Sequence, residues 1–387
     1  MGIYALERRK QMGMQSRIRI CFILSHIPQG GAERQTINLI KGLNTSLYEL
    51  TLIIYANTEV FYREVLDLPV KIFMHQSPET GKLRRNINNA IYLRKVLLNN
   101  DFDVLHTLLF HNGFWVRLLA PGKYSNRIVY SIRNGLENLS RAEKLIEKLM
   151  VKRSRVITNS QKVMHQYLDM VGRKYRMRVT NIYNGIDETQ FISENPPKVT
   201  DQIIIGTVGR QTALKNQIQA LEAIGSIYGK YALHFYLIGD KNQDGYLSNL
   251  NYVRKENIGD YVTILDSQPD ISVYYKMMNV FILSSFTESC PNVLFEAMLA
   301  KCLCIVSSGA NSDHFISDGI NGFVYDGSTE MLTSKLISAI ELIRNGQFET
   351  IVDNGQKFAI GNFSLSAMIS NYEMVYQSIV DKQRELA

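Results

Sequence analysis

Short apolar runs alternate with amphipathic, helix-like stretches along most of the 387-residue chain. Short apolar runs between polar turns are typical of strands that are buried on both faces of a parallel sheet. The first half of the chain has six of them, which we predict as strands: Ile18–Leu24, Leu50–Ile54, Val70–Phe73, Phe102–Leu105, Arg127–Ile132 and Arg155–Thr158. Helical patterns fall between several of these strands, at Ala32–Leu43, Leu83–Leu98 and Leu139–Val151.

The pattern is interrupted at Ser193–Pro197, where two prolines fall in a polar stretch, and we predict a linker there. The alternation then starts again, with five predicted strands: Ile203–Val208, Leu233–Ile238, Val262–Leu265, Val280–Ser284 and Cys302–Val306. Helices are predicted among them at Asn216–Tyr228 and Asn292–Ala300. Two successive series of this kind predict two doubly wound α/β domains with mainly parallel sheets, whose ligands bind at the carboxyl ends of the strands.

Composition is that of an ordinary globular protein, with 45% hydrophobic and 20% charged residues. No apolar run approaches the roughly 20 residues that span a bilayer. The charged segment Met1–Arg17 lacks the apolar core of a signal peptide, so we expect a cytoplasmic protein with an N-terminal extension over residues 1–16. The four cysteines lack the spacing of a metal site or redox pair and are expected to be reduced.

The net charge of +7 leaves two alternatives open. The basic clusters mark an anionic partner, such as phosphates or a membrane surface, or they form a solvated surface with no partner. Nucleic acid is the weaker choice, because the sequence contains no helix-turn-helix, zinc-finger or RNP-like signature.

The segment Ser284–Met298 carries the most chemistry. A buried strand is predicted to end near Ser284, and Pro291 after the polar loop suits the first turn of a helix. The start of such a helix points N–H groups at the strand-end crevice and binds anionic oxygens. Glu288 and Glu296 flank it, and carboxylates accept hydrogen bonds from sugar and ribose hydroxyls. The alternative for two glutamates alone is a loop acid and a surface helix acid.

In this context, Glu288 and Glu296 with seven residues between them resemble the EX7E signature of the retaining glycosyltransferases of family 4, which have the GT-B fold. The resemblance implies that Glu288 contacts the donor sugar and that Glu296 holds the ribose hydroxyls. It also implies that the backbone of the intervening segment binds the sugar and the diphosphate, through Ser289, Cys290, Pro291, Asn292, Val293 and Leu294.

Two glycine-containing segments resemble other motifs of the same family. The stretch after the strand Ile203–Val208, from Gly209 and Arg210 to Lys215, resembles the family's VGR-x4-K motif, which implies donor binding by these residues. Two cations suit a leaving nucleoside diphosphate, which gains negative charge in the transition state. Gly30 and Gly31 resemble the family's GGAE loop and imply a close approach of backbone to the donor, the alternative being a tight turn before a helix.

The acceptor side is less defined. His106 and His111 are predicted at the carboxyl end of one strand, where each is either an ordinary polar residue or part of the site. Arg133 stands where some relatives have a sugar-contacting histidine. An arginine cannot be a general base, but it can bind an acceptor phosphate or the donor diphosphate.

The resemblance covers about Ile18 to Tyr325 and implies two Rossmann-like domains that face each other across a cleft. We expect an acceptor domain over residues 17–195, a sugar-nucleotide domain over 196–362, and a C-terminal helical segment over 363–387 that returns to the first domain. Ser289, where the family often has glycine, and Lys301–Cys304, where it has a GxP run, depart from the pattern. Neither departure removes a group to which we assign chemistry.

The implied activity is retaining transfer of a sugar from a UDP- or GDP-sugar to a glycan or lipid-linked glycan of the cell surface, such as a capsule or lipopolysaccharide. No metal and no cofactor are expected, because the two cations take the metal's role. The acceptor is expected on a polyprenyl diphosphate, and the basic amphipathic stretch Leu139–Val151 is a candidate for contact with anionic lipid. A sugar-nucleotide epimerase and a non-catalytic sugar-nucleotide-binding protein of the same fold remain alternatives, whereas an oxidoreductase would need a GxGxxG that the sequence lacks.

Overall fold

The computed structural model describes residues 17–25, 31–56, 63–77, 81–133, 135–136, 139–198 and 202–386. Packing divides the chain into two compact units: the chain up to Gly185 together with Met368–Ala387, and the continuous segment Ile186–Ala367. The sequence placed its divisions at 195/196 and 362/363, a short way from these two positions. The predicted extension, residues 1–16, lies outside the described residues.

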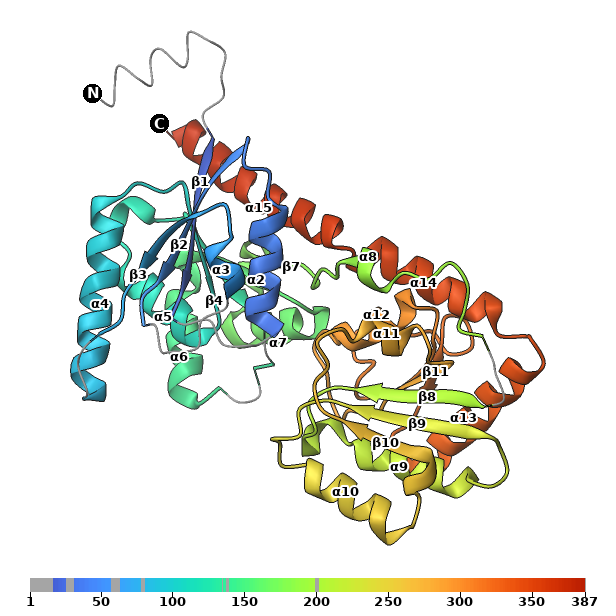
Figure 1. The fold of residues 1–387 in the computed structure, drawn as a ribbon. Coiled ribbons are helices and arrows are strands. Elements are labelled where there is room, and N and C mark those ends of the chain that lie inside the picture. The colour runs from blue at the N-terminus through green and yellow to red at the C-terminus, as the bar shows by residue number, and fades with distance from the viewer. Residues whose placement is uncertain are drawn as a thin grey trace. The chain divides into compact units, whose positions relative to one another are not determined.

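The first unit is built on a seven-stranded parallel sheet in the order β3-β2-β1-β4-β5-β6-β7 (Figure 1). Its strands are β1 (Ile18–Leu24), β2 (Tyr48–Ile54), β3 (Lys71–Met74), β4 (Val104–Leu108), β5 (Ile128–Ile132), β6 (Ser154–Thr158) and β7 (Val179–Asn181). Its helices are α2 (Gly31–Gly42), α3 (Arg63–Leu66), α4 (Lys82–Asn99), α5 (Phe110–Leu119), α6 (Arg141–Met150), α7 (Gln161–Val171) and most of α15 (Leu365–Leu386). Short 3-10 turns occupy η1 (Gly122–Tyr124), η2 (Val151–Arg153) and η3 (Arg173–Arg178).

The second unit is built on a six-stranded parallel sheet in the order β10-β9-β8-β11-β12-β13. Its strands are β8 (Ile203–Val208), β9 (Leu233–Ile238), β10 (Val262–Leu265), β11 (Val280–Leu283), β12 (Leu303–Ser307) and β13 (Phe323–Tyr325). Its helices are α8 (Glu188–Phe191), α9 (Gln217–Ile227), α10 (Tyr246–Lys255), α11 (Ser272–Tyr275), α12 (Asn292–Leu299), α13 (Thr329–Arg344) and α14 (Glu349–Phe363). The 3-10 turns are η4 (Ala213–Lys215) and η5 (Gly259–Tyr261).

The predicted class of two doubly wound parallel-sheet domains is confirmed. The reason is visible in the central strands: every residue of β4, β5, β11 and β12 is buried, as expected for strands covered by helices on both faces. The bounds of β1, β8, β9 and β10 coincide with the predicted runs. The short strands β7 and β13 and the helices α13 and α14 are additional to the predicted elements.

In both sheets the strand order reverses at one point. It lies between β1 and β4 in the first unit and between β8 and β11 in the second. In an open parallel sheet, the loops that leave the two strands at such a point diverge to opposite faces, and the crevice between them binds ligands. The predicted site of the second unit is therefore expected at the loops after β8 and β11.

A buried ion pair fixes α6 within the first unit. The guanidinium of Arg117 on α5 donates to both carboxylate oxygens of Glu147 on α6, and the two side chains are 0% and 1% exposed. Arg117 also donates to the carbonyl of Gly113 and lies over the ring of Tyr130, while Tyr167 donates to Glu147. A buried charge pair holds its position when each partner has its further hydrogen bonds satisfied, as here.

Within the described part of the chain, no helix is long and apolar enough to cross a membrane. The same residues contain no group of three His, Cys, Asp or Glu side chains that could hold a metal ion.

Candidate functional site

The structure brings two of the predicted catalytic residues into direct contact. The Nζ of Lys215, in the turn after β8, lies 2.5 Å from Oε1 of Glu288, in the loop after β11. Their side chains are only 20% and 13% exposed, so the pair is sheltered but still open to a ligand. The two residues come from the two loops that flank the reversal of strand order.

Hydrogen bonds to backbone carbonyls join these two loops. The N–H of Phe286 donates to the carbonyl of Leu214 at 3.0 Å, and the hydroxyl of Ser284 donates to the carbonyl of Lys215 at 3.1 Å. Because these bonds fix the backbone on both sides, Lys215 and Glu288 meet without relying on their own ion pair.

A second layer of hydrogen bonds orients Glu288. The hydroxyl of Ser285 donates to Oε1 of Glu288 at 2.7 Å, and that of Ser312 donates to its carbonyl at 3.0 Å. Gly309, in the loop after β12, lies so near Phe286 that a Cβ would come within 2.1 Å of the Phe286 carbonyl oxygen. Sequence reasoning did not select Ser312 or Gly309, because only the fold brings the loop after β12 to Glu288. It did not select Ser285 either, although Ser285 lies three residues before Glu288 in the same motif.

Arg210 follows β8 and its side chain is exposed. Its neighbour Gly209 packs against Gly239 after β9, where a Cβ would lie 1.9 Å from the Gly209 carbonyl oxygen. The pKa of Asp240 is lowered, mainly by the backbone N–H of Asn242 and to a smaller extent by the charge of Arg210. The loops after β8 and β9 are thus packed closely enough for Arg210 and Asp240 to influence each other.

Helix α12 begins at Asn292 behind Pro291, without a side-chain N-cap. Ser289, Cys290, Asn292 and Val293 are partly exposed around this helix start, so a ligand can reach them. Two of the residues predicted to donate backbone hydrogen bonds to the donor, Pro291 and Leu294, have a different role in the structure.

The N–H of Leu294 donates to the carbonyl of Pro291 at 3.0 Å, and its side chain is fully buried, because the first turn of α12 closes on itself. Pro291 has no N–H to offer and is itself buried. Both therefore shape the helix start, and the backbone donors predicted for this segment have to come from its other residues.

Glu296 lies on α12 and accepts a hydrogen bond from the hydroxyl of Tyr275 at 2.9 Å. Desolvation raises its carboxyl pKa to about 7, against a smaller lowering effect of the Tyr275 hydrogen bond. A carboxyl that titrates near neutrality can accept from a ligand hydroxyl when ionised. Tyr275, on α11, is a partner that sequence reasoning missed.

The candidates of the first unit fall into different environments. Gly30 lies outside the described residues, and Gly31 is the first residue of α2. His111 is exposed on the first turn of α5 and makes an edge contact with Trp115, with ring centroids 6.3 Å apart. It is accessible to a ligand.

His106 was predicted at the end of a strand, but β4 continues to Leu108 and places the residue inside the sheet, 0% exposed. Its Nδ1 bonds with the hydroxyl of Tyr376 at 2.7 Å and its Nε2 with that of Ser131 at 2.8 Å. Desolvation, with a contribution from the charge of Arg133, lowers the pKa of His106 to about 3. Both ring nitrogens are occupied, so His106 supports the interior and does not face an acceptor.

Arg133, after β5, is 7% exposed. It donates to Oδ1 of Asn184 at 2.7 Å and to the hydroxyl of Tyr372 at 2.5 Å. Residues far apart in sequence therefore meet around it, all within the first unit.

Comparison with family models covers both units. Residues 29–190 match the model described as Glycosyltransferase Family 4, and residues 188–357 match the one described as Glycosyl transferases group 1. The two matches divide the chain close to the point where the packing divides it.

Individual proteins and solved structures are also similar to this chain. The UDP-Gal:alpha-D-GlcNAc-diphosphoundecaprenol alpha-1,3-galactosyltransferase of Escherichia coli is 23% identical over 340 residues, 80% of this chain and 84% of that protein. A glycosyltransferase structure from Rickettsia africae matches with a TM-score of 0.80 and 18% identity over 95% of this chain and 99% of that chain. The structure of Anabaena Alr3699/HepE with UDP and glucose matches with a TM-score of 0.77 and 18% identity over 94% and 100%.

Proposed function

Since the chain belongs to the family 4 glycosyltransferases and has the GT-B fold, we propose that it transfers a sugar from a UDP-sugar to a polyprenyl-diphosphate-linked glycan, with retention at the anomeric carbon. The relative from E. coli is named for a UDP-galactose donor and a diphosphoundecaprenol acceptor, and Anabaena HepE is titled as a complex with UDP and glucose. These names support the donor and acceptor classes. A role in the synthesis of a surface polysaccharide follows from the same acceptor class.

The observation that carries the proposal is the contact between Lys215 and Glu288. Together they give a cation for the donor diphosphate and a carboxylate for the donor sugar, held in place by the loop-to-loop bonds. Arg210 supplies a second cation on the exposed surface nearby. Preorganised charges that face a developing charge are the largest usual source of catalysis.

In the proposed reaction, the bond between the anomeric carbon and the diphosphate oxygen breaks, and the electron pair leaves with UDP. The acceptor hydroxyl forms its new bond on the same face, and its proton passes to the departing diphosphate. Lys215 and Arg210 stabilise the charge on that diphosphate. Glu288 orients the sugar, and Glu296 accepts from the ribose hydroxyls when it is ionised. We propose that no metal takes part, because the two cations do this work.

The test combines the full chain with a UDP-sugar and a synthetic polyprenyl-diphosphate-linked sugar. Product formation with the anomeric configuration of the donor, read by proton NMR, supports the proposal. A product of inverted configuration would contradict retention. Conversion of the sugar nucleotide in the absence of any acceptor would favour an epimerase instead. If UDP- and GDP-sugars bind but none of them is turned over with this acceptor, a non-catalytic binding protein would be favoured.

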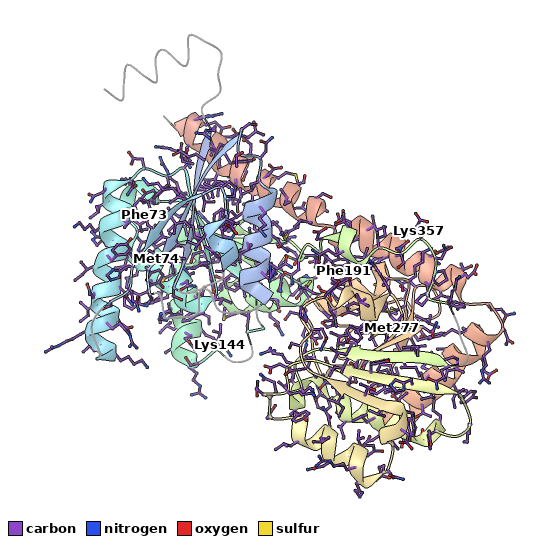
Figure 2. The ribbon with its side chains drawn as sticks, viewed as in Figure 1. Phe73, Met74, Lys144, Phe191, Met277 and Lys357 are labelled. Carbon is purple, nitrogen blue, oxygen red and sulfur yellow. The ribbon has the colours of Figure 1, made fainter. Side chains whose placement is uncertain are left out.

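Helix α6 is the proposed contact with the membrane that carries such an acceptor. Leu145 and Leu149 are 58% and 71% exposed and lie one turn apart, on the side of α6 away from the buried Glu147. Lys144, labelled in Figure 2, and Lys148 lie on the same helix, so exposed apolar side chains are flanked by cations. Helices of this composition bind anionic bilayers at the interface.

Sedimentation with anionic liposomes at low salt tests this contact. Replacing both Leu145 and Leu149 by glutamate should reduce the bound fraction severalfold. The matched control is the same pair of changes at Leu83 and Leu98, which are also exposed but lie on α4. Equal binding by both double variants would remove α6 as the contact.

A further inference from the structure

Among the described residues of the first unit, Arg117 and Arg133 are buried, and their charges are compensated differently. Arg117 is 0% exposed and is neutralised by the carboxylate of Glu147. Arg133 is 7% exposed, and among the described residues it makes no ion pair. Its two partners, the side chains of Asn184 and Tyr372, are neutral. A buried charge without a counter-ion is costly, so an anion that binds next to Arg133 would supply the missing counter-charge.

The hydrogen-bonding capacity of Arg133 is also incompletely used. A guanidinium has five N–H donors. One goes to Asn184 and one to Tyr372, while Nε is buried without a hydrogen-bond partner. The positive charge of Arg133 acts on neighbouring groups, since it contributes to the lowered pKa of His106. The side chain is therefore held in a fixed position with donors to spare.

Arg133 lines a pocket of about 150 Å³ whose other walls are largely apolar. The lining side chains include Leu109, Phe110, Ile132, Leu136 and Leu139. Leu109, directly after β4, has a φ of 64°, a backbone conformation that is costly for a leucine and clusters at ligand-binding positions. The pocket thus offers one cation among side chains that are mainly apolar.

We infer that this pocket binds the phosphate of the acceptor together with the first part of its hydrocarbon chain. An anion with several oxygens, such as a phosphate, matches the planar fork of an arginine. The leucine and phenylalanine walls suit an alkyl chain better than the hydroxyls of a sugar phosphate. The inference rests on the proposed function for its acceptor class, and it assigns the group that recognises the carrier.

In the polypeptide, this pocket lies directly before the helix proposed to contact the membrane. Leu139 lines the pocket, Ser140 caps α6, and α6 then carries the exposed Leu145 and Leu149. A hydrocarbon chain that leaves the pocket past Leu139 would therefore meet the start of the helix that we propose to touch the bilayer.

The experiment measures binding of farnesyl diphosphate to the full chain by isothermal titration, with inorganic diphosphate and farnesol as the two partial probes. Farnesyl diphosphate should bind at least tenfold more tightly than either partial probe. Arg133→Met should weaken its binding at least tenfold and leave UDP binding unchanged. Arg94→Met, which removes an exposed arginine of α4, should bind as the unaltered protein does.

Each contrary result overturns a stated part of the inference. Unchanged binding of farnesyl diphosphate by Arg133→Met overturns the role of Arg133. Loss of binding in Arg210→Ala, with Arg133→Met unaffected, places the probe at the donor site and overturns the pocket. Equally tight binding of inorganic diphosphate overturns the hydrocarbon component.

If Arg133→Met does not fold, Leu139→Glu takes its place. It puts a negative charge at the half-buried edge of the pocket and should weaken binding at least tenfold, so unchanged binding overturns the inference. Because the readout is binding, its result is independent of whether the protein transfers a sugar.

Discussion

The ammonium of Lys215 lies 2.5 Å from a carboxylate oxygen of Glu288, although the two residues are 73 positions apart in the sequence. Each belongs to a loop that leaves one of two adjacent strands, β8 and β11. The ion pair and the bond from Ser284 to the Lys215 carbonyl hold this part of the loop in place. In the proposed reaction, the phosphates of the donor would give the ammonium a second anionic partner next to Glu288.

Glu288→Gln should lower kcat/KM for sugar transfer by about 100-fold or more, which corresponds to roughly 3 kcal/mol of transition-state stabilisation. The change keeps the size of the side chain and removes its charge, so the melting temperature should change little. Initial rates of UDP release in the presence of acceptor measure the effect.

Lys215→Ala should lower kcat/KM by a similar factor. The double variant of Glu288→Gln and Lys215→Ala should lose much less transition-state stabilisation than the sum of the two single losses, because the two side chains are in contact. Full additivity would show that Lys215 and Glu288 act independently. Rates close to those of the unaltered protein for Glu288→Gln would contradict the assigned role of that residue.

Donor affinity should rise between about pH 6 and pH 8, because the pKa of Glu296 is raised to about 7 and the carboxylate forms over this interval. The dissociation constant of UDP, measured across the interval, should be nearly flat in Glu296→Gln. Tyr275→Phe removes a hydrogen bond that lowers this pKa, so the midpoint should move to higher pH. A pH profile of Glu296→Gln identical to that of the unaltered protein would contradict this origin.

The same raised pKa has an effect of known sign on stability. The folded protein holds the Glu296 proton more tightly than the unfolded chain, whose glutamate has the ordinary value of 4.5. This contribution to stability is complete below about pH 4.5 and is lost as the pH rises through about 7.

Gly239→Ala should destabilise the second unit by about 1–3 kcal/mol and weaken donor binding, because its Cβ would lie 1.9 Å from the carbonyl oxygen of Gly209, next to Arg210. Urea unfolding and UDP titration measure the two effects. The matched control is Gly259→Ala, where a Cβ meets nothing within 4 Å, and the expected change is within about 0.5 kcal/mol. Similar stability of the two variants would show that the loops after β8 and β9 relax freely.

Glu147→Gln should destabilise the first unit by about 3–5 kcal/mol, because it leaves the guanidinium of Arg117 buried without its counter-charge. Asp169→Asn is the control, since its partner Arg173 is 86% exposed and such a pair is worth at most about 1 kcal/mol. Urea unfolding compares the two. Equal effects would mean that Arg117 finds another partner when Glu147 loses its charge.

Periodicity was sufficient for the strands whose apolar runs end in polar turns, as β8 and β9 do, because a strand buried on both faces has few other solutions. It misplaced the end of β4, since Thr107 is polar yet belongs to the strand, where it donates to the carbonyl of Ile23. His106 was consequently expected at the carboxyl end of the strand, whereas it lies within β4 and is fully buried.

The candidate site was predictable where its residues lie in one motif, as Glu288 and Glu296 do. The partners that tune these residues come from other elements: Ser312 for Glu288 and Tyr275 for Glu296. Around Arg133 the separation is larger, because Tyr372 lies 239 positions away. No local pattern contains that information, since it arises only when α15 packs on the sheet.

The packing of α15 also has a consequence for the order in which the chain folds during synthesis. Tyr372 and Tyr376 are fully buried in the first unit, where they bond with Arg133 and His106. The second unit, Ile186–Ala367, is continuous in sequence. The ribosome has therefore synthesised all of it before these two tyrosines emerge. Domains usually complete their folding in the order of synthesis. Here we expect the first unit to wait, with its polar interior open, until the second has been made.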